Sequence, residues 1–115
     1  MNIEELREYC LSKASTTEEF PFDETTLAFK VAGKIFVITS IDEFDGVNLK
    51  CDPEKAIELR EEYSGIEPGY HMNKKHWNTV RPNTDVSDNK IKELIDHSYE
   101  MVIKGLPKKV RMELK

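Results

Sequence analysis

Residues 26–51 hold three consecutive extended segments joined by two short turns, and this arrangement restricts the fold more than any other feature. In "LAFKV", Leu27, Phe29 and Val31 alternate with smaller or polar residues, and "KIFVITSI" is a nearly continuous β-branched run. Ala32-Gly33 supplies the first turn, and "DEFDG" leads into "VNLKC", where apolar and polar residues alternate again. Strands that follow one another through short turns pair antiparallel. The segment therefore predicts an antiparallel meander.

Three segments around the meander have the spacing of amphipathic helices. The first covers residues 2–14, and the second begins where Asp52 caps and Pro53 opens a helix. The third follows Ser87 as its N-cap and ends near Gly105. Its buried stripe is expected to consist of Ile91, Leu94, Ile95, Ser98, Met101 and Val102.

The remaining segments complete the predicted architecture. "TTEEFPFDE" is expected to be an extended link and "KKVRMELK" a short charged extension, whereas residues 70–81 are expected to form a second hairpin. We therefore expect one α+β domain over residues 1–115. It has two layers, an antiparallel sheet of about five strands and helices packed on one face of that sheet.

Charge is unevenly distributed along this acidic chain, whose net charge is −5. Residues 1–67 carry 7 Lys and Arg against 16 Asp and Glu, whereas residues 68–84 carry three cations and no acid. Segregation of this kind can produce a local basic face on an acidic protein. The sequence holds no apolar run long enough for a membrane span, and Cys10 and Cys51 are expected to be reduced, buried thiols. We expect a cytoplasmic protein.

The stretch "PGYHMNKKHWNTV" concentrates aromatic, amide and basic side chains. As a hairpin it turns at Asn73–Lys75, and alternation then places Trp77, Thr79 and Arg81 on one face of the second strand. His76, Asn78 and Val80 take the opposite face. Lysines at the tip would neutralise phosphates, and aromatic and amide groups beside them would contact sugars or bases.

Several other interpretations of these residues stay open. The single Trp is more typical of a core residue, and His71 with His76 could supply two metal ligands across a hairpin, fewer than a zinc site needs. Pairing either His with Cys51 would give a catalytic dyad, although a thiol at the end of an alternating strand is usually inert. The acidic face around Glu4, Glu8 and Glu19 could hold a hard cation. We predict no enzyme activity, no cofactor and no metal.

Four stretches resemble the MmcQ/YjbR family of small bacterial proteins: "PFDETTLAFKVAGKIFVIT", "VNLKCDPEKAIELREEY", "GIEPGYHMNKKHWNTV" and "LIDHSYEMV". The resemblance covers about residues 3–106. It implies a fold similar to CyaY, the bacterial frataxin, with helices on one side of an antiparallel sheet. It also implies DNA binding through strands arranged like a double-wing motif. The residues implicated, with Arg81 added as a further cation, are Tyr70, His71, Asn73, Lys74, Lys75, His76, Trp77, Asn78, Thr79 and Arg81.

Two functions are therefore expected from this patch. The first is weak binding of double-stranded DNA through the hairpin. The alternative is a non-enzymatic module that binds a small anionic ligand or a protein partner through the same side chains.

Overall fold

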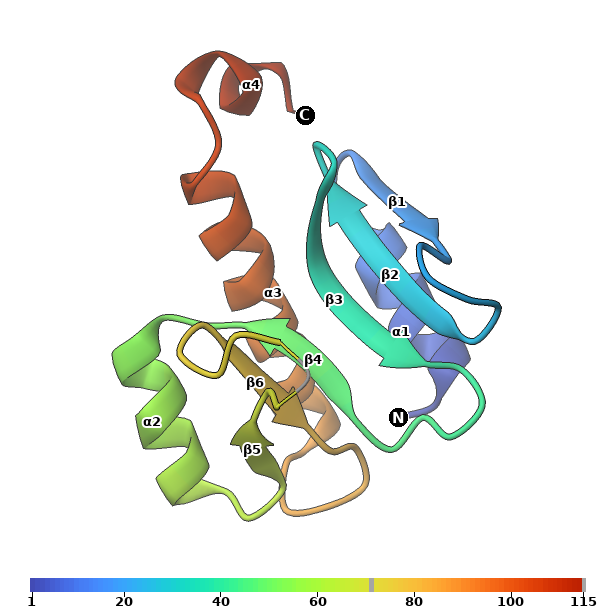
Figure 1. The fold of residues 1–115 in the computed structure, drawn as a ribbon, viewed down its shortest axis with the longest axis vertical. Coiled ribbons are helices and arrows are strands. Elements are labelled where there is room, and N and C mark those ends of the chain that lie inside the picture. The colour runs from blue at the N-terminus through green and yellow to red at the C-terminus, as the bar shows by residue number, and fades with distance from the viewer. Residues whose placement is uncertain (71, 115) are drawn as a thin grey trace.

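The computed structural model describes residues 1–70 and 72–114 as a sheet flanked by helices (Figure 1). In chain order the elements are α1 (Ile3–Leu11), β1 (Thr16–Glu19), β2 (Thr26–Val31), β3 (Lys34–Ser40), β4 (Val47–Lys50), α2 (Pro53–Glu62), β5 (Ile66–Pro68), β6 (Trp77–Val80), α3 (Asp88–Lys104) and α4 (Lys108–Glu113).

All strand pairs in the sheet are antiparallel, in the order β1-β2-β3-β4-β6-β5. The predicted meander is β2, β3 and β4, and Gly33 takes the positive φ of 78° that its turn requires. The sheet has one strand more than the expected five, because part of the predicted link is β1. Thr16–Glu19 pairs along β2, and Glu19 forms an ion pair with Lys30.

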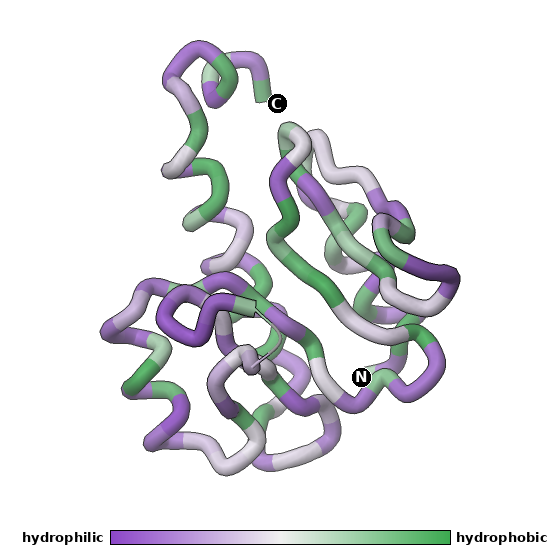
Figure 2. Tube along the Cα trace, in the orientation of Figure 1, coloured by the Kyte–Doolittle hydropathy of each residue, from purple (hydrophilic) through white to green (hydrophobic). Residues whose placement is uncertain are grey.

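Helices α1, α2 and α3 cover one face of the sheet and enclose the core. Leu6 of α1, Leu59 of α2 and Ile95 of α3 belong to the same buried cluster as Val37 and Leu49 of the sheet. In Figure 1, α1 and α3 lie behind the strands, and Figure 2 shows β3 as a hydrophobic stretch running through the middle of the molecule. The predicted two-layer α+β fold is confirmed, and the opposite face of the sheet carries no helix among the described residues.

Caps set the helix boundaries much as the sequence predicts. Asn2 and Glu5 form a reciprocal capping box, Asp52 accepts a hydrogen bond from the Lys55 N–H, and Ser87 accepts one from Lys90. Helix α1 ends at Leu11, earlier than the expected residue 14. Within the predicted stripe of α3, all residues are buried except Met101, which is half-buried.

A β-bulge in β3 brings two consecutive side chains into the core. Phe29 of β2 pairs with Val37, whereas its neighbour Lys30 pairs with Ile35, so Phe36 is an extra residue in the strand. Phe36 and Val37 are both fully buried. The bulge coincides with the end of the β3–β4 ladder, and Ser98 of α3 reaches this point from behind the sheet.

The tail predicted as a charged extension is helical over Lys108–Glu113 and buries none of its residues. It lies at one end of the long axis of the molecule (Figure 1). None of the helices in the described part of the chain is long and apolar enough to cross a membrane.

Candidate binding groove on the open face of the sheet

The helix-free face of the sheet, here termed the open face, presents one continuous row of side chains across five strands. Strand register pairs these residues in sequence, each opposite the next: Ala28, Ile38, Asn48, Thr79 and Glu67. The adjacent row, which includes Val47, Val80 and Ile66, belongs to the buried core. Because side chains alternate between the two faces of a strand, the Asn48–Thr79 row projects away from the helices.

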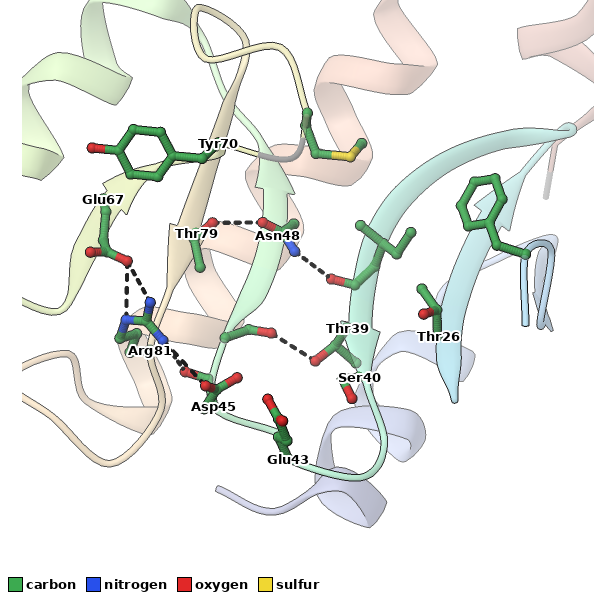
Figure 3. A pocket seen from close by; sticks show the side chains of 14 residues that line it. Thr26, Thr39, Ser40, Glu43, Asp45, Asn48, Glu67, Tyr70, Thr79 and Arg81 are labelled. Atoms are coloured by element: carbon green, nitrogen blue, oxygen red, sulfur yellow. Dashed lines mark hydrogen bonds and ion pairs between the residues drawn. The ribbon is translucent and has the colours of Figure 1, made fainter. Parts of the chain in front are cut away.

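A groove with a volume of about 580 Å³ runs over this row. Its floor is mostly polar, its apolar lining comes from one floor residue and two loops, and three carboxylates stand at its rim (Figure 3). The polar floor consists of Thr26, Ser40, Asn48 and Thr79, and Thr39, 2% exposed in the row of Val47, also borders the groove. The apolar lining consists of Ile38 from β3, Phe22 from the β1–β2 loop and Tyr70 and Met72 from the β5–β6 loop. The rim carboxylates are Glu43, Asp45 and Glu67.

Hydrogen bonds hold three of the polar side chains that line the groove, Thr39, Asn48 and Thr79, in fixed orientations. The Thr79 hydroxyl donates to Oδ1 of Asn48 at 2.6 Å, and Nδ2 of Asn48 donates to the Ile38 carbonyl at 3.3 Å. The Thr39 hydroxyl donates to the Gly46 carbonyl at 2.8 Å. Figure 3 shows these bonds linking β6, β4 and β3 across the base of the groove. The floor is therefore preorganised, which lowers the entropic cost of binding a ligand.

Arg81 is held by carboxylates at the rim of the groove. Its Nε and Nη2 both donate to one oxygen of Glu67, at 3.1 and 2.5 Å, and Nη1 donates to the Asp45 carbonyl at 3.1 Å. The Asp45 carboxylate lies 3.6 Å from Nη1. Arg81 lies on the same face as Thr79, which agrees with the predicted alternation. Whether Arg81 contacts phosphate stays a prediction, and in the structure its charge is compensated by Glu67 and Asp45.

The segment expected to be a two-stranded finger is mostly a loop. The strands that pair are β5 and β6, so the first strand precedes Gly69, and residues 69–76 connect the two. Asn73 organises this connection: its side chain accepts from the Lys75 N–H, and its carbonyl accepts from His76 and Trp77. The loop folds over the open face, which brings Tyr70 and Met72 to the groove.

The candidate DNA-binding residues separate into distinct environments. Tyr70, Asn73, Lys74 and Lys75 are exposed on the loop, and the Lys74 ammonium lies 5.3 Å from the centre of the Tyr70 ring. The other candidate on the loop, His71, lies outside the described residues.

The remaining candidates lie at or in β6. Trp77 and His76 are half-buried, and Thr79 is in the groove. Asn78 is 2% exposed and donates to the Ala56 carbonyl of α2 at 3.3 Å. It therefore faces the core, where alternation placed it, and its side chain does not reach the surface that the other candidates share.

Most of the groove lies outside the stretch "PGYHMNKKHWNTV". Glu43, Asp45 and Asn48 belong to the β3–β4 turn and β4, and Phe22 belongs to the segment expected to be a link. The sequence pattern that could predict these groove residues is the set of polar side chains that face outward in each alternating strand. The alternation in "VNLKC" indicates that Asn48 faces outward, but the register that places it beside Thr79 joins strands about 30 residues apart.

Neither Cys10 nor Cys51 lines the groove. Burial raises the pKa of the Cys10 thiol to about 12 and that of the Cys51 thiol to about 11, and both cysteines are free and buried. Cys51 contacts His76 through the backbone, where its N–H donates to the His76 carbonyl at 2.7 Å. In the described ranges 1–70 and 72–114, no three His, Cys, Asp or Glu residues form a group that could hold a metal ion.

Comparison with known proteins relates the whole fold to one family. A family model described as YjbR matches residues 11–101. The chain is 43% identical to the uncharacterized protein YbdF of Escherichia coli O157:H7 over 78% of this chain and 75% of that protein. It is 33% identical to the uncharacterized protein YjbR of Escherichia coli K12 over 96% of this chain and 95% of that protein.

Two solved structures share the architecture. A crystal structure of the Deinococcus radiodurans protein DR2400 matches with a TM-score of 0.91 and 39% identity, covering 97% of this chain and 86% of that one. A crystal structure of a Pseudomonas syringae protein matches with a TM-score of 0.75 and 28% identity, covering 88% of this chain and 98% of that one.

Proposed function

The chain belongs to the YjbR family, and from the geometry of its open face we propose that it is a non-enzymatic binding module whose ligand occupies the groove. The observation that carries this proposal is the groove itself, a hollow of about 580 Å³ over a hydrogen-bonded polar floor. Small-molecule sites typically measure about 300–1,000 Å³ and combine apolar walls with a few oriented polar groups. The groove has both properties.

The chemistry of the thiols supports a binding role rather than catalysis. A nucleophilic cysteine needs a thiolate, and burial raises the pKa of both Cys10 and Cys51 far above neutral pH. We also propose a cytoplasmic location, which two unbonded thiols support.

A variant that fills the groove tests the proposal. Ser40 lies at the floor, so Ser40→Tyr places a ring in the space that a ligand would use. Thr17→Tyr is the matched control, because Thr17 is exposed on β1 and does not line the groove. The assay is a thermal-shift screen of charged and neutral metabolites. A ligand at 100 times its Kd stabilises by about 2.7 kcal/mol, or roughly 11 °C for a domain of this size.

We expect compounds that stabilise the wild type and Thr17→Tyr but leave Ser40→Tyr unchanged. If no compound stabilises the wild type, or if every hit stabilises Ser40→Tyr equally, the groove is not a ligand site.

Binding of double-stranded DNA is the second candidate function, supported by the exposed loop that carries Lys74 and Lys75. Neither ammonium forms an ion pair with a carboxylate among the described residues. Tyr70, exposed beside them, offers a ring for stacking. With Arg81 paired, two lysines remain as phosphate contacts, so log affinity is expected to fall against log salt with a slope of about −1.8.

Fluorescence anisotropy with a labelled duplex tests this second function. The Lys74→Ala/Lys75→Ala variant is expected to lose binding and its salt dependence. Lys108→Ala/Lys109→Ala removes the same charge from α4, at one end of the long axis (Figure 1). Equal losses in both variants would indicate unspecific attraction to any cation and would exclude the loop as a DNA site.

A further inference from the structure

The groove that we propose as a ligand site is acidic, although the stretch "PGYHMNKKHWNTV" beside it is basic. Its rim holds Glu43, Asp45 and Glu67, and Arg81 is the one cation among its lining residues within the described chain. The lysines of the β5–β6 loop do not line it. A ligand in the groove therefore meets an excess of two negative charges, which disfavours the anionic ligand expected from the sequence.

Arg81 leaves most of the carboxylate oxygens at the rim without a partner. Both of its bonds to Glu67 go to Oε1, and its approach to the Asp45 carboxylate is to Oδ2. Within residues 1–70 and 72–114, Glu67 Oε2, Asp45 Oδ1 and the Glu43 carboxylate have no hydrogen-bond or ion-pair partner. These acceptors suit a donor with several N–H groups, such as a guanidinium or an ammonium.

Apolar groups stand beside these acceptors. Phe22 and Tyr70 are 72% and 61% exposed, unusual values for large aromatic side chains, and they line the groove from loops at different parts of the sheet. Ile38, which is 6% exposed, contributes the one apolar side chain of the floor among the described residues, on a strand between them in strand order. An aromatic face attracts cations, and on the Tyr70 ring that place is taken by the Lys74 ammonium, 5.3 Å from the ring centre. The groove therefore combines apolar and anionic surface.

From this combination we infer that the groove binds a small organic cation, in which a guanidinium or ammonium group is attached to an apolar segment. The cationic group pairs with free carboxylate oxygens at the rim, those of Glu43 among them, and the apolar segment lies over the floor toward the exposed rings. The three carboxylates are spread along the rim and do not form a metal-binding group among the described residues. This distribution favours an extended organic cation over a metal ion. The inference rests on the proposed function and specifies its ligand class.

A matched pair of probes separates charge from shape. Butylguanidinium and butylurea have nearly the same size and differ in charge, and adenosine diphosphate serves as the anionic probe. Each is titrated into the isotope-labelled protein while amide chemical shifts are recorded by NMR. We expect butylguanidinium to shift the amides of Asn48 and Thr79, and butylurea to shift them at least threefold more weakly. Added salt weakens the binding of the cation.

Two charge variants test the assignment of the carboxylates. Glu43→Gln is expected to weaken the binding of butylguanidinium about threefold, the usual effect of removing one exposed ion pair. Glu8→Gln removes the same charge from the exposed surface of α1, which packs on the other face of the sheet, and should have no effect. If both variants weaken binding equally, the cation responds to the overall negative charge and the inference is wrong.

The probes also distinguish failure of the inference from failure of the proposed function. If adenosine diphosphate or butylurea shifts the groove amides and butylguanidinium does not, the groove binds ligands but its cation preference is refuted. If no metabolite in the thermal-shift screen stabilises the protein and all three probes leave these amides unchanged, the proposed function itself fails.

Discussion

Ser98 replaces a missing part of the sheet ladder, and its removal is therefore expected to be unusually costly. The β3–β4 ladder ends where Val37 lies opposite Leu49. Beyond that point, the Lys50 N–H donates to Oγ of Ser98 at 2.9 Å, and the Ser98 hydroxyl donates to the Phe36 carbonyl at 2.6 Å. Ser98 is 0% exposed. In Ser98→Ala, two backbone groups at the bulge lose their partner.

The expected magnitude follows from those two groups. An unsatisfied buried donor or acceptor costs about 1–3 kcal/mol, so the pair costs about 4 kcal/mol at mid-range. Alanine regains about 0.5 kcal/mol because it forms helices better than serine. The net loss in the free energy of unfolding is about 3.5 kcal/mol. With an unfolding entropy of about 2.1 cal/mol/K per residue, this lowers the Tm by about 14 °C.

Urea denaturation and calorimetry measure this change, and hydrogen exchange at the Lys50 amide reports on it locally. Ser40→Ala is the matched control, since Ser40 is half-buried on the open face and its hydroxyl makes no hydrogen bond to the described residues; its loss should stay below about 0.5 kcal/mol. A loss of less than about 1 kcal/mol in Ser98→Ala, with the Lys50 amide still protected, would refute the bridging role.

Three further predictions follow from buried or capping groups. Burial raises the pKa of Cys51 to about 11 and that of Cys10 to about 12. Cys51 should therefore react with a disulfide reagent at pH 8 about 100-fold more slowly in the native than in the urea-unfolded chain, and Cys10 more slowly still. Equal rates in the two states would contradict this. Burial lowers the pKa of His97, whose Nε2 accepts a hydrogen bond from the Asp52 N–H at 3.2 Å. The contribution of His97 to the free energy of unfolding should therefore be complete above about pH 6.5 and decline as the pH falls toward the lower folded-state pKa. His97→Gln should flatten that decline in urea titrations at several pH values; an unchanged pH profile would argue against it. Asp52→Ala should lower the Tm by about 4 °C, corresponding to about 1 kcal/mol for a lost N-cap, whereas Asp42→Ala in an exposed turn should leave it unchanged.

Elements governed by local chemistry were predictable from the sequence. The N-caps Asp52 and Ser87 and the Gly33 turn lie within a few residues of the groups that they serve. Their effects do not depend on the rest of the fold. The α+β class followed from the same local patterns, because consecutive hairpins require an antiparallel sheet.

Features that depend on distant partners were missed or displaced. β1 consists of the polar residues Thr16–Glu19, and it is a strand because β2 offers a free edge rather than because of its own pattern. The second hairpin was shifted because Asn73 and its polar neighbours resemble a tight turn, whereas the actual connection spans residues 69–76. The ion pairs of Arg81 were not predictable from the sequence, because Glu67 and Asp45 reach it only in the folded chain.

The order of the strands divides the sheet into two blocks. β1 to β4 form one block and β5 with β6 form another, and the two blocks share a single strand pairing, Val47–Lys50 against Trp77–Val80 (Figure 1). Asn48 and Thr79, in the floor of the groove, lie on either side of that join. A ligand bound in the groove would contact both blocks. Its binding would therefore stabilise the pairing of β4 with β6 and, with it, the whole sheet.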